Sequence, residues 1–319
     1  MKIKPIIIVA GEPKSIFFEV FFKAIKSNKF KSPLILIGSL KILQNQMRNL
    51  QFHKKIKLLN SKNLENYKLN NKFINLIDVK INNKSKKNFE YSNLYIKNCF
   101  DISFKILKSG YTNKLINGPI NKSKFLKKRY LGITEYIAKN FKIKKFGMLL
   151  YNENLSVSPL TTHLPLKQIS KKINKNLIKK QIILINNFYK RNVGFKPKIA
   201  ITGLNPHCES VLKFNEDTKI IGPTVSTLKK LGFKIFGPFA GDTIFLKNNR
   251  KKYNVILGMY HDQVLSPFKT LFEYDAFNIT LGLPFLRVSP DHGPNEKMLG
   301  KNVSNPLSLI KAIKFLDKK

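Results

Sequence analysis

Four of the five histidines in this chain stand where an apolar run ends, and this placement indicates a catalytic site. The runs that read as strands are followed by His163, His207, His261 and His292. In open α/β sheets, ligands bind beyond the carboxyl ends of the strands, so these side chains are expected to face one rim. A single histidine at a strand end is more often a structural residue. Four of five in that position favour a shared chemical role.

Three of these histidines suit a catalytic divalent metal ion. The histidines lie in separate loops, and three neutral imidazoles would leave a coordination position open for a substrate oxygen. A structural zinc site would need a fourth ligand, usually a thiolate, and the chain has two cysteines, Cys99 and Cys208. Cys208 is a possible ligand because it follows His207, although a small core thiol is the simpler interpretation. Two scattered cysteines are typical of reduced thiols and not of a disulfide framework.

A second interpretation of His261 is a hydrolase dyad with Asp262. Neighbouring residues on a chain are expected to point apart, and no G-x-S-x-G elbow supplies a nucleophile. Both phosphate-loop signatures, G-x-x-x-x-G-K-[ST] and G-x-G-x-x-G, are also missing, so any nucleotide cofactor must be held in a non-Rossmann manner. The metal-ligand interpretation is therefore favoured over the dyad and over a turn residue without a role.

Three further polar residues, Lys269, Asn278 and Arg287, follow His261 at intervals of about nine. Lysine is abundant in this chain, so Lys269 alone carries little information. Arg287 is one of five arginines and follows the apolar stretch GLPFL. A guanidinium group can bind a carboxylate or phosphate through two parallel hydrogen bonds. A structural ion pair is the alternative.

The elements that must position these residues alternate between strands and helices, which predicts an α/β fold with a mostly parallel sheet. Strands are expected at 3–10, 32–39, 114–116, 146–152, 155–163, near 199, at 233–239, at 254–260 and after 278. Helices are expected from residue 15 and at 169–189, 216–231 and 306–316; the second of these rests on an apolar stripe through Ile169, Ile173 and Leu177. The Asn/Lys-rich residues 60–90 are expected to form irregular surface structure.

The net charge of +41 does not by itself indicate a nucleic-acid-binding protein. Almost all of it is lysine spread along the chain, without the basic-aromatic stripe or motifs of known binders. No segment approaches the ~18 apolar residues of a membrane span, and the apolar run at the N-terminus is shorter than a signal-peptide core. A soluble cytoplasmic protein with neither a nucleic-acid nor a membrane partner is expected.

Several motifs accompany the histidines, and together they resemble those of the 4-hydroxythreonine-4-phosphate dehydrogenase family of vitamin B6 biosynthesis. In chain order they are GEP, GPINK, TEY, TTHLPL, GLNPH, GPFAGDTIF, YHDQ with PFK, NITLGLPF and SPDHG. The resemblance spans roughly residues 5–315. It implies a two-lobed fold of the isocitrate/isopropylmalate dehydrogenase kind, with the active site in the inter-lobe cleft of a homodimer. The first lobe is expected at residues 1–135 plus 295–319, and the second at 136–294.

The resemblance also implies roles for individual residues. A divalent metal ion (Zn, Mg or Co) would be bound by His163, His207 and His261, with His261 reaching into the partner subunit's site. The residues expected to hold a phosphorylated amino-acid substrate are Thr134, Lys269, Asn278 and Arg287. NAD, or NADP, is expected near Asp291, His292 and Gly293. The implied reaction is oxidation of 4-phosphohydroxy-L-threonine, followed by decarboxylation to 3-amino-2-oxopropyl phosphate.

Three segments depart from the family pattern. Ile133 stands where the family has a histidine that is expected to contact substrate, and isoleucine cannot donate a hydrogen bond. Residues 208–212 replace a glycine-rich acidic stretch, and Pro294-Asn295 replace small residues. The first alternative is therefore a dehydrogenase of the same fold for another phosphorylated hydroxy acid, such as 4-phospho-erythronate or 4-phospho-threonate. The second is a basic nucleic-acid-binding protein that has kept the fold and lost catalysis.

Overall fold

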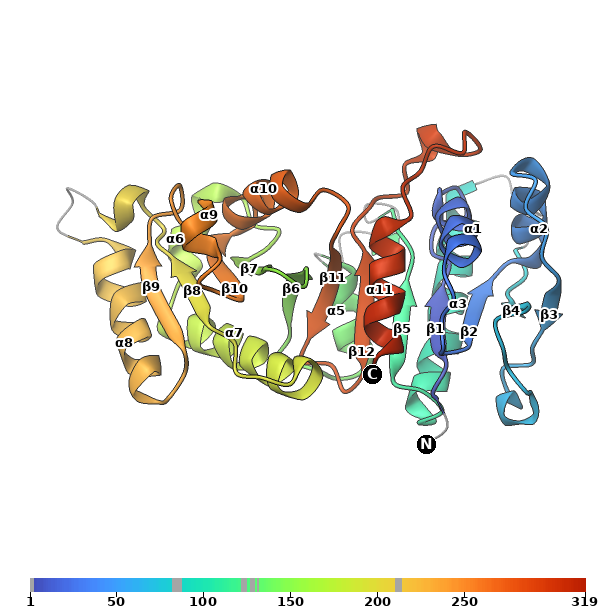
Figure 1. Cartoon of the computed structure of the whole chain (residues 1–319), viewed down its shortest axis with the longest axis horizontal. Coiled ribbons are helices and arrows are strands. Elements are labelled where there is room, and N and C mark those ends of the chain that lie inside the picture. Colours follow the sequence, from blue (N-terminus) through green and yellow to red (C-terminus); the bar gives the residue numbers. More distant parts are fainter. Residues whose placement is uncertain (1–2, 82–87, 122–124, 127–129, 131, 210–213) are drawn as a thin grey trace. The chain divides into compact units, whose positions relative to one another are not determined.

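The chain forms two compact units, and each is described by itself (Figure 1). The first comprises Met1–Ile133, Tyr274–Phe277 and Pro284–Lys319, and the second comprises Thr134–Glu273 and Asn278–Leu283. The computed structural model describes the chain except for residues 1–2, 82–87, 122–124, 127–129, 131 and 210–213. Residues 274–277 and 284–294 belong to the second lobe expected from the sequence. Both segments lie in the first unit, the latter because strand β12 (Leu286–Pro290) pairs with β5 (Lys114–Asn117).

The strands of the first unit pair in parallel. Their order is β3 (Ile56–Leu58), β4 (Ile74–Asp78), β2 (Leu34–Gly38), β1 (Ile6–Val9), β5 and β12. Every residue of β1 and β2 is buried, which explains why these strands are apolar without alternation; β5 is also buried throughout but includes Lys114 and Asn117. The helices of this unit are α1 (Phe17–Ser27), α2 (Leu40–Asn49), α3 (Asn88–Lys108) and α11 (Leu307–Asp317), with single 3-10 turns at Leu64–Asn66 and Glu296–Met298.

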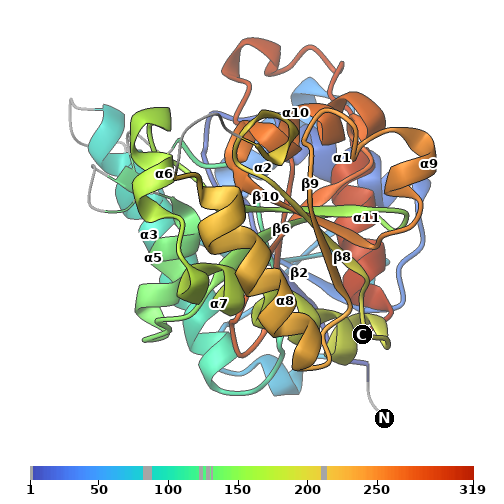
Figure 2. The same cartoon turned by 90° about the vertical axis from the view of Figure 1, so that its left-hand side faces the viewer.

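The second unit has a mixed set of strands. Their order is β11 (Phe277–Leu281), β6 (Gly147–Tyr151), β7 (Ser156–Thr161), β10 (Val255–Tyr260), β8 (Ile199–Thr202) and β9 (Ile235–Phe239). The pairs from β7 to β9 are parallel, and β6 is antiparallel to β7. The α-helices are α5 (Ile133–Asn140), α6 (Ile169–Lys172), α7 (Lys175–Phe188), α8 (Gly222–Lys230), α9 (Lys247–Arg250) and α10 (His261–Phe272). Helices α7 and α8 lie side by side (Figure 2). The predicted α/β class with mostly parallel strands is confirmed.

The single helix predicted at 169–189 is wrong. Helix α6 ends at Lys172, its C-cap Ile173 has an extended backbone, and α7 begins after Asn174. The Asn174 side chain accepts a hydrogen bond from Leu177 N at 2.9 Å. Asparagine is a favoured N-cap because its side chain satisfies a backbone N–H that the first helical turn leaves unpaired. The apolar stripe therefore continues across a break in the helix.

Two more elements differ from the expectation. Residues 60–90 were predicted to be irregular, but β4 lies among them and four of its five residues are buried; residues 82–87 are outside the described part. Helix α10 was not predicted because Pro267 interrupts its pattern. Proline removes one backbone N–H from a helix interior, yet α10 continues through it because Val264, Leu265 and Phe268 bury its apolar face.

None of the helices in the described residues has the length and apolar character required to cross a membrane.

Candidate functional site

Three adjacent parallel strands of the second unit carry the three predicted metal ligands. The strand order β7-β10-β8 places their carboxyl ends along one edge, and Tyr260 of β10 is in register with Thr161 of β7. His261 directly follows β10, His163 follows β7 by two residues, and His207 lies five residues beyond β8. The shared edge is the geometric reason why strand-end residues far apart in sequence come near one another.

The imidazole rings of His163 and His261 lie near each other. Their ring centroids are 6.1 Å apart, with an angle of 37° between the ring planes. That separation is compatible with one nitrogen of each ring binding the same cation at about 2 Å. Both imidazoles reach the surface, so a ligand can approach them.

His261 also contacts its neighbour Asp262. The distance from His261 Nδ1 to Asp262 Oδ1 is 2.6 Å, so the expectation that these adjacent side chains point apart is wrong. The two residues are the first of helix α10. Their side chains therefore do not alternate between two faces as they would in a strand, and the Asp262 carboxylate contacts the His261 ring. A carboxylate on one ring nitrogen keeps the proton there and leaves Nε2 as the metal-binding atom. The contact is thus compatible with metal binding by His261, and Asp262 is not among the site residues predicted from the sequence.

His207 lies in a strained loop held by a buried carboxylate. Its φ of 56° and that of Cys208, 63°, are left-handed values that non-glycine residues seldom adopt. Asp217 is 1% exposed and accepts hydrogen bonds from Leu204 N at 2.7 Å, Asn205 N at 3.1 Å and Asn205 Nδ2 at 2.8 Å. Strain of this kind collects at functional sites where the surroundings hold it in place. No local pattern in the sequence marks Asp217, because its partners precede it by 12 or 13 residues.

The close packing of this loop also explains a glycine. A Cβ on Gly203 would lie 2.6 Å from Asp217 Oδ1 and 2.7 Å from Cys208 Sγ, so no side chain fits there. Burial, with the charge of Asp217, raises the pKa of the Cys208 thiol. Burial raises the pKa of Cys99 to about 12, as expected for an inert core thiol. Residues 210–212 of the segment that departs from the family lie outside the described residues.

The chemistry of the donor set fits a divalent cation, although one chain does not complete the predicted triad. In the part of the chain that the structure describes, no group of three or more His, Cys, Asp and Glu side chains has the geometry of a metal site. The structure therefore brings His163 and His261 together and leaves His207 on the neighbouring loop of the same edge.

Polar residues also collect beyond adjacent strands of the first unit. Arg287 on β12 is 2% exposed, and its Nε donates to Asn117 Oδ1 at the end of β5 at 2.7 Å. The Asp291-His292-Gly293 segment follows β12, and Asp291 N donates to Ser308 Oγ at 2.8 Å. Among the described residues, the buried His292 Nε2 has no hydrogen-bond partner. An orphaned imidazole nitrogen is suited to a polar group of a cofactor, so the segment fits the predicted nicotinamide nucleotide.

Burial lowers the pKa of His292 below its ordinary value of 6.5, against smaller opposing effects of Gly293 O and Asp291. Below about pH 6.5 the unfolded chain therefore binds more protons than the folded chain, and unfolding becomes easier as the pH falls. We expect wild-type protein to lose more unfolding free energy than His292→Gln between about pH 7.5 and about pH 5.5. Urea titrations across this range measure the difference. A constant difference between the two proteins would contradict the prediction.

The other predicted substrate residues lie in the second unit or at its start. Thr134 Oγ1 is 3.4 Å from Thr280 Oγ1 on β11, and Thr280 shares a strand face with Asn278, two residues earlier. The half-buried Ile133 opens α5. Lys269 is exposed on α10, eight residues and therefore about 12 Å along the helix axis from His261. The structure thus joins Thr134 to the face of Asn278 and separates Lys269 from the His261 end of its own helix.

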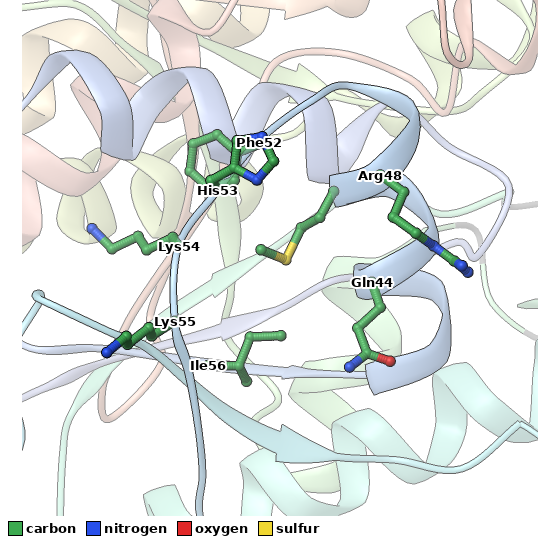
Figure 3. A pocket seen from close by; sticks show the side chains of 8 residues that line it. Gln44, Arg48, Phe52, His53, Lys54, Lys55 and Ile56 are labelled. Atoms are coloured by element: carbon green, nitrogen blue, oxygen red, sulfur yellow. The ribbon is translucent and has the colours of Figure 1, made fainter.

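A pocket of about 880 Å³ lies elsewhere, in the first unit (Figure 3). Gln44 and Arg48 line it from α2, while His53 and the residues up to Ile56 line it from the segment leading into β3. None of the predicted site residues lines this pocket. The candidate site is therefore defined by the strand ends and not by this hollow.

The two units are α/β folds with largely parallel strands, and imidazole side chains follow the strand ends of the second unit. The family model for the pyridoxal phosphate biosynthetic protein PdxA matches residues 29–316, and the chain belongs to this family. The predicted family and the predicted oxidoreductase class are confirmed.

Individual relatives agree with this membership. A 4-hydroxythreonine-4-phosphate dehydrogenase of Sulfurihydrogenibium sp. (strain YO3AOP1) is 37% identical over 97% of this chain and 96% of its own length. A D-threonate 4-phosphate dehydrogenase of Pectobacterium atrosepticum is 34% identical over 68% of each chain. The crystal structure of 4-hydroxythreonine-4-phosphate dehydrogenase from Klebsiella pneumoniae is similar with a TM-score of 0.83, at 27% identity and with 98% of each chain covered.

Proposed function

We propose that this chain oxidises 4-phosphohydroxy-L-threonine with NAD or NADP, in pyridoxal 5'-phosphate biosynthesis. Loss of CO2 from the oxidised product then yields 3-amino-2-oxopropyl phosphate. The observation that carries the proposal is the His163–His261 pair, with Asp262 on His261, at the edge formed by three parallel strands. Family membership and the names of the relatives support the substrate.

The imidazoles of His163, His207 and His261 would hold the divalent cation. In a homodimer, His261 would serve the partner subunit's site. The 6.1 Å separation supports joint ligation by His163 and His261 of one chain. When bound, the cation would supply Lewis-acid stabilisation of the substrate alkoxide, and the nicotinamide would supply the hydride acceptor.

The chain's own residues then bind and orient the substrate. Asp262 retains the proton on His261 Nδ1 and keeps that ring in one orientation. The guanidinium of Arg287 and the ammonium of Lys269 would neutralise the phosphate and carboxylate of the substrate. Thr134 and Asn278 supply hydrogen bonds from neighbouring positions. His292, whose pKa is lowered by burial, offers a neutral ring to the cofactor.

A second candidate substrate is 4-phospho-threonate or 4-phospho-erythronate. It is favoured by Ile133, which stands at the substrate-contacting histidine position of the family, and by the similarity to a D-threonate 4-phosphate dehydrogenase. These acids carry a hydroxyl group where phosphohydroxythreonine carries an ammonium group. A change in one hydrogen-bonding contact can therefore decide between them.

Steady-state assays of NAD and NADP reduction with all three substrates test the proposal. We expect the highest kcat/KM with 4-phosphohydroxy-L-threonine and stoichiometric release of CO2. A higher kcat/KM with a phosphorylated sugar acid would establish the second candidate. No turnover of any substrate, together with tight RNA binding that weakens steeply with salt, would instead favour the inactive nucleic-acid-binding alternative.

A further inference from the structure

We propose that Gln263 is a positioning residue that fixes the spacing of the histidine loops in the second unit. The inference rests on the metal-dependent function proposed above. Gln263 lies two residues after His261 in the first turn of α10 and is half-buried. It belongs to the YHDQ motif, but its side chain is directed to backbone and side-chain groups of the strand ends and not to the imidazoles.

The Gln263 amide joins the ends of two neighbouring strands. Its Oε1 accepts hydrogen bonds from Met259 N of β10 at 2.7 Å and from Thr202 Oγ1 of β8 at 2.8 Å. Its Nε2 donates to Gly203 O, just after β8, at 2.7 Å. A carbonyl oxygen has two lone pairs, and both are used here. The three partners therefore determine which way the amide faces.

The same network extends to the third histidine loop. Thr161 Oγ1 at the end of β7 donates to Met259 O at 2.7 Å. Hydrogen bonds thus run from β7 through Met259 to Gln263 and on to β8, across the three strands that lead to the histidines. A Cβ on Gly258 would lie 2.4 Å from Val264 Cγ1, so a glycine allows α10 to pack this closely on β10.

An amide is the group that this position requires. A carboxylate could not donate to Gly203 O, and an apolar side chain would leave Met259 N, Gly203 O and the buried Thr202 hydroxyl without their partner. Without these hydrogen bonds, the loops of His207 and His261 would no longer be held at one separation. Replacing a residue that orients a metal ligand without touching the metal typically lowers metal affinity by about 10–100-fold.

Cobalt(II) titration of the full-length apoprotein, followed by visible absorption, tests the inference without measuring turnover. Gln263→Met is expected to weaken Co²⁺ binding by about 10–100-fold and to change the absorption band, because the ligand geometry changes. The matched control is Gln181→Met. Gln181 is another buried amide of the second unit, and its Nε2 donates to Ser158 Oγ within β7 at 2.7 Å, away from the strand end. Both variants should lose thermal stability, but Gln181→Met should keep wild-type Co²⁺ affinity and spectrum.

Thr202→Val is the second variant because it removes one hydrogen bond to Gln263 and keeps the side-chain shape. It should weaken Co²⁺ binding less than Gln263→Met does, and it decides the question if Gln263→Met does not fold. Wild-type Co²⁺ affinity in both Thr202→Val and a folded Gln263→Met would overturn the positioning role and leave the proposed function intact. Absence of Co²⁺ binding by the wild-type protein would overturn the proposed metal site and this inference together.

Discussion

Replacing His261 with alanine is expected to lower kcat by about 10³-fold. The substitution removes one imidazole of the His163–His261 pair and with it a ligand of the proposed cation. Metal content measured by atomic absorption should fall in parallel with activity. The variant should remain folded, because the ring is partly exposed.

The matched control for this change is His53→Ala. His53 is an exposed histidine of the first unit and lines the pocket of Figure 3, away from the strand ends. It should retain wild-type activity and metal content. Asp262→Asn should give an intermediate loss of about 10–100-fold, since it keeps a hydrogen-bonding side chain but loses the carboxylate. Full turnover by His261→Ala after thorough chelation would exclude the proposed role of the histidines.

Replacing Arg287 with methionine is expected to lower kcat/KM by about 10²–10³-fold, mainly through an increased KM for the phosphorylated substrate. Arg287 is 2% exposed, and its Nε is held by Asn117 Oδ1, so its guanidinium group has one orientation. A preorganised guanidinium binds an anion without the entropy cost of ordering a flexible side chain. Isothermal titration with the substrate and steady-state kinetics separate the loss of binding from the loss of turnover.

Two lysine substitutions complete this test. Arg287→Lys retains the charge but loses the planar fork and the bond to Asn117, and should recover only part of the affinity. Arg250→Lys is the control, because Arg250 donates to the backbone oxygen of Phe245 in the second unit and is given no role in catalysis. Equal substrate affinity of Arg287→Met and the wild-type protein, with both folded by circular dichroism, would rule out anion binding by Arg287.

The elements could be predicted from the sequence where local pattern and burial agree. Strands β1, β2 and β10 are apolar runs that are buried almost throughout, so their hydrophobicity alone marks them. The stripe from Ile169 to Leu177 has helical spacing too, but the Asn174 cap divides it into two helices. The spacing of apolar residues shows which face of a helix is apolar. It does not show where a side-chain cap begins a new helix. Strand β4 was not predicted, because its short apolar run lies among asparagines and lysines and gives only a weak pattern.

What the sequence alone determined about this protein is the set of candidate groups for the proposed chemistry. The histidines and Arg287 follow or occupy strands, and parallel strands place their carboxyl ends on one edge, so a local pattern sufficed to select them. Only the tertiary structure decided how these groups are held. Strand pairing joins segments that are far apart in sequence, as in the order β7-β10-β8 and the pairing of β12 with β5. The hydrogen bonds of Asp217 and Gln263 likewise join residues that are many positions apart. Hydrogen bonds of this kind depend on which chain segments meet in space, and no local spacing records that.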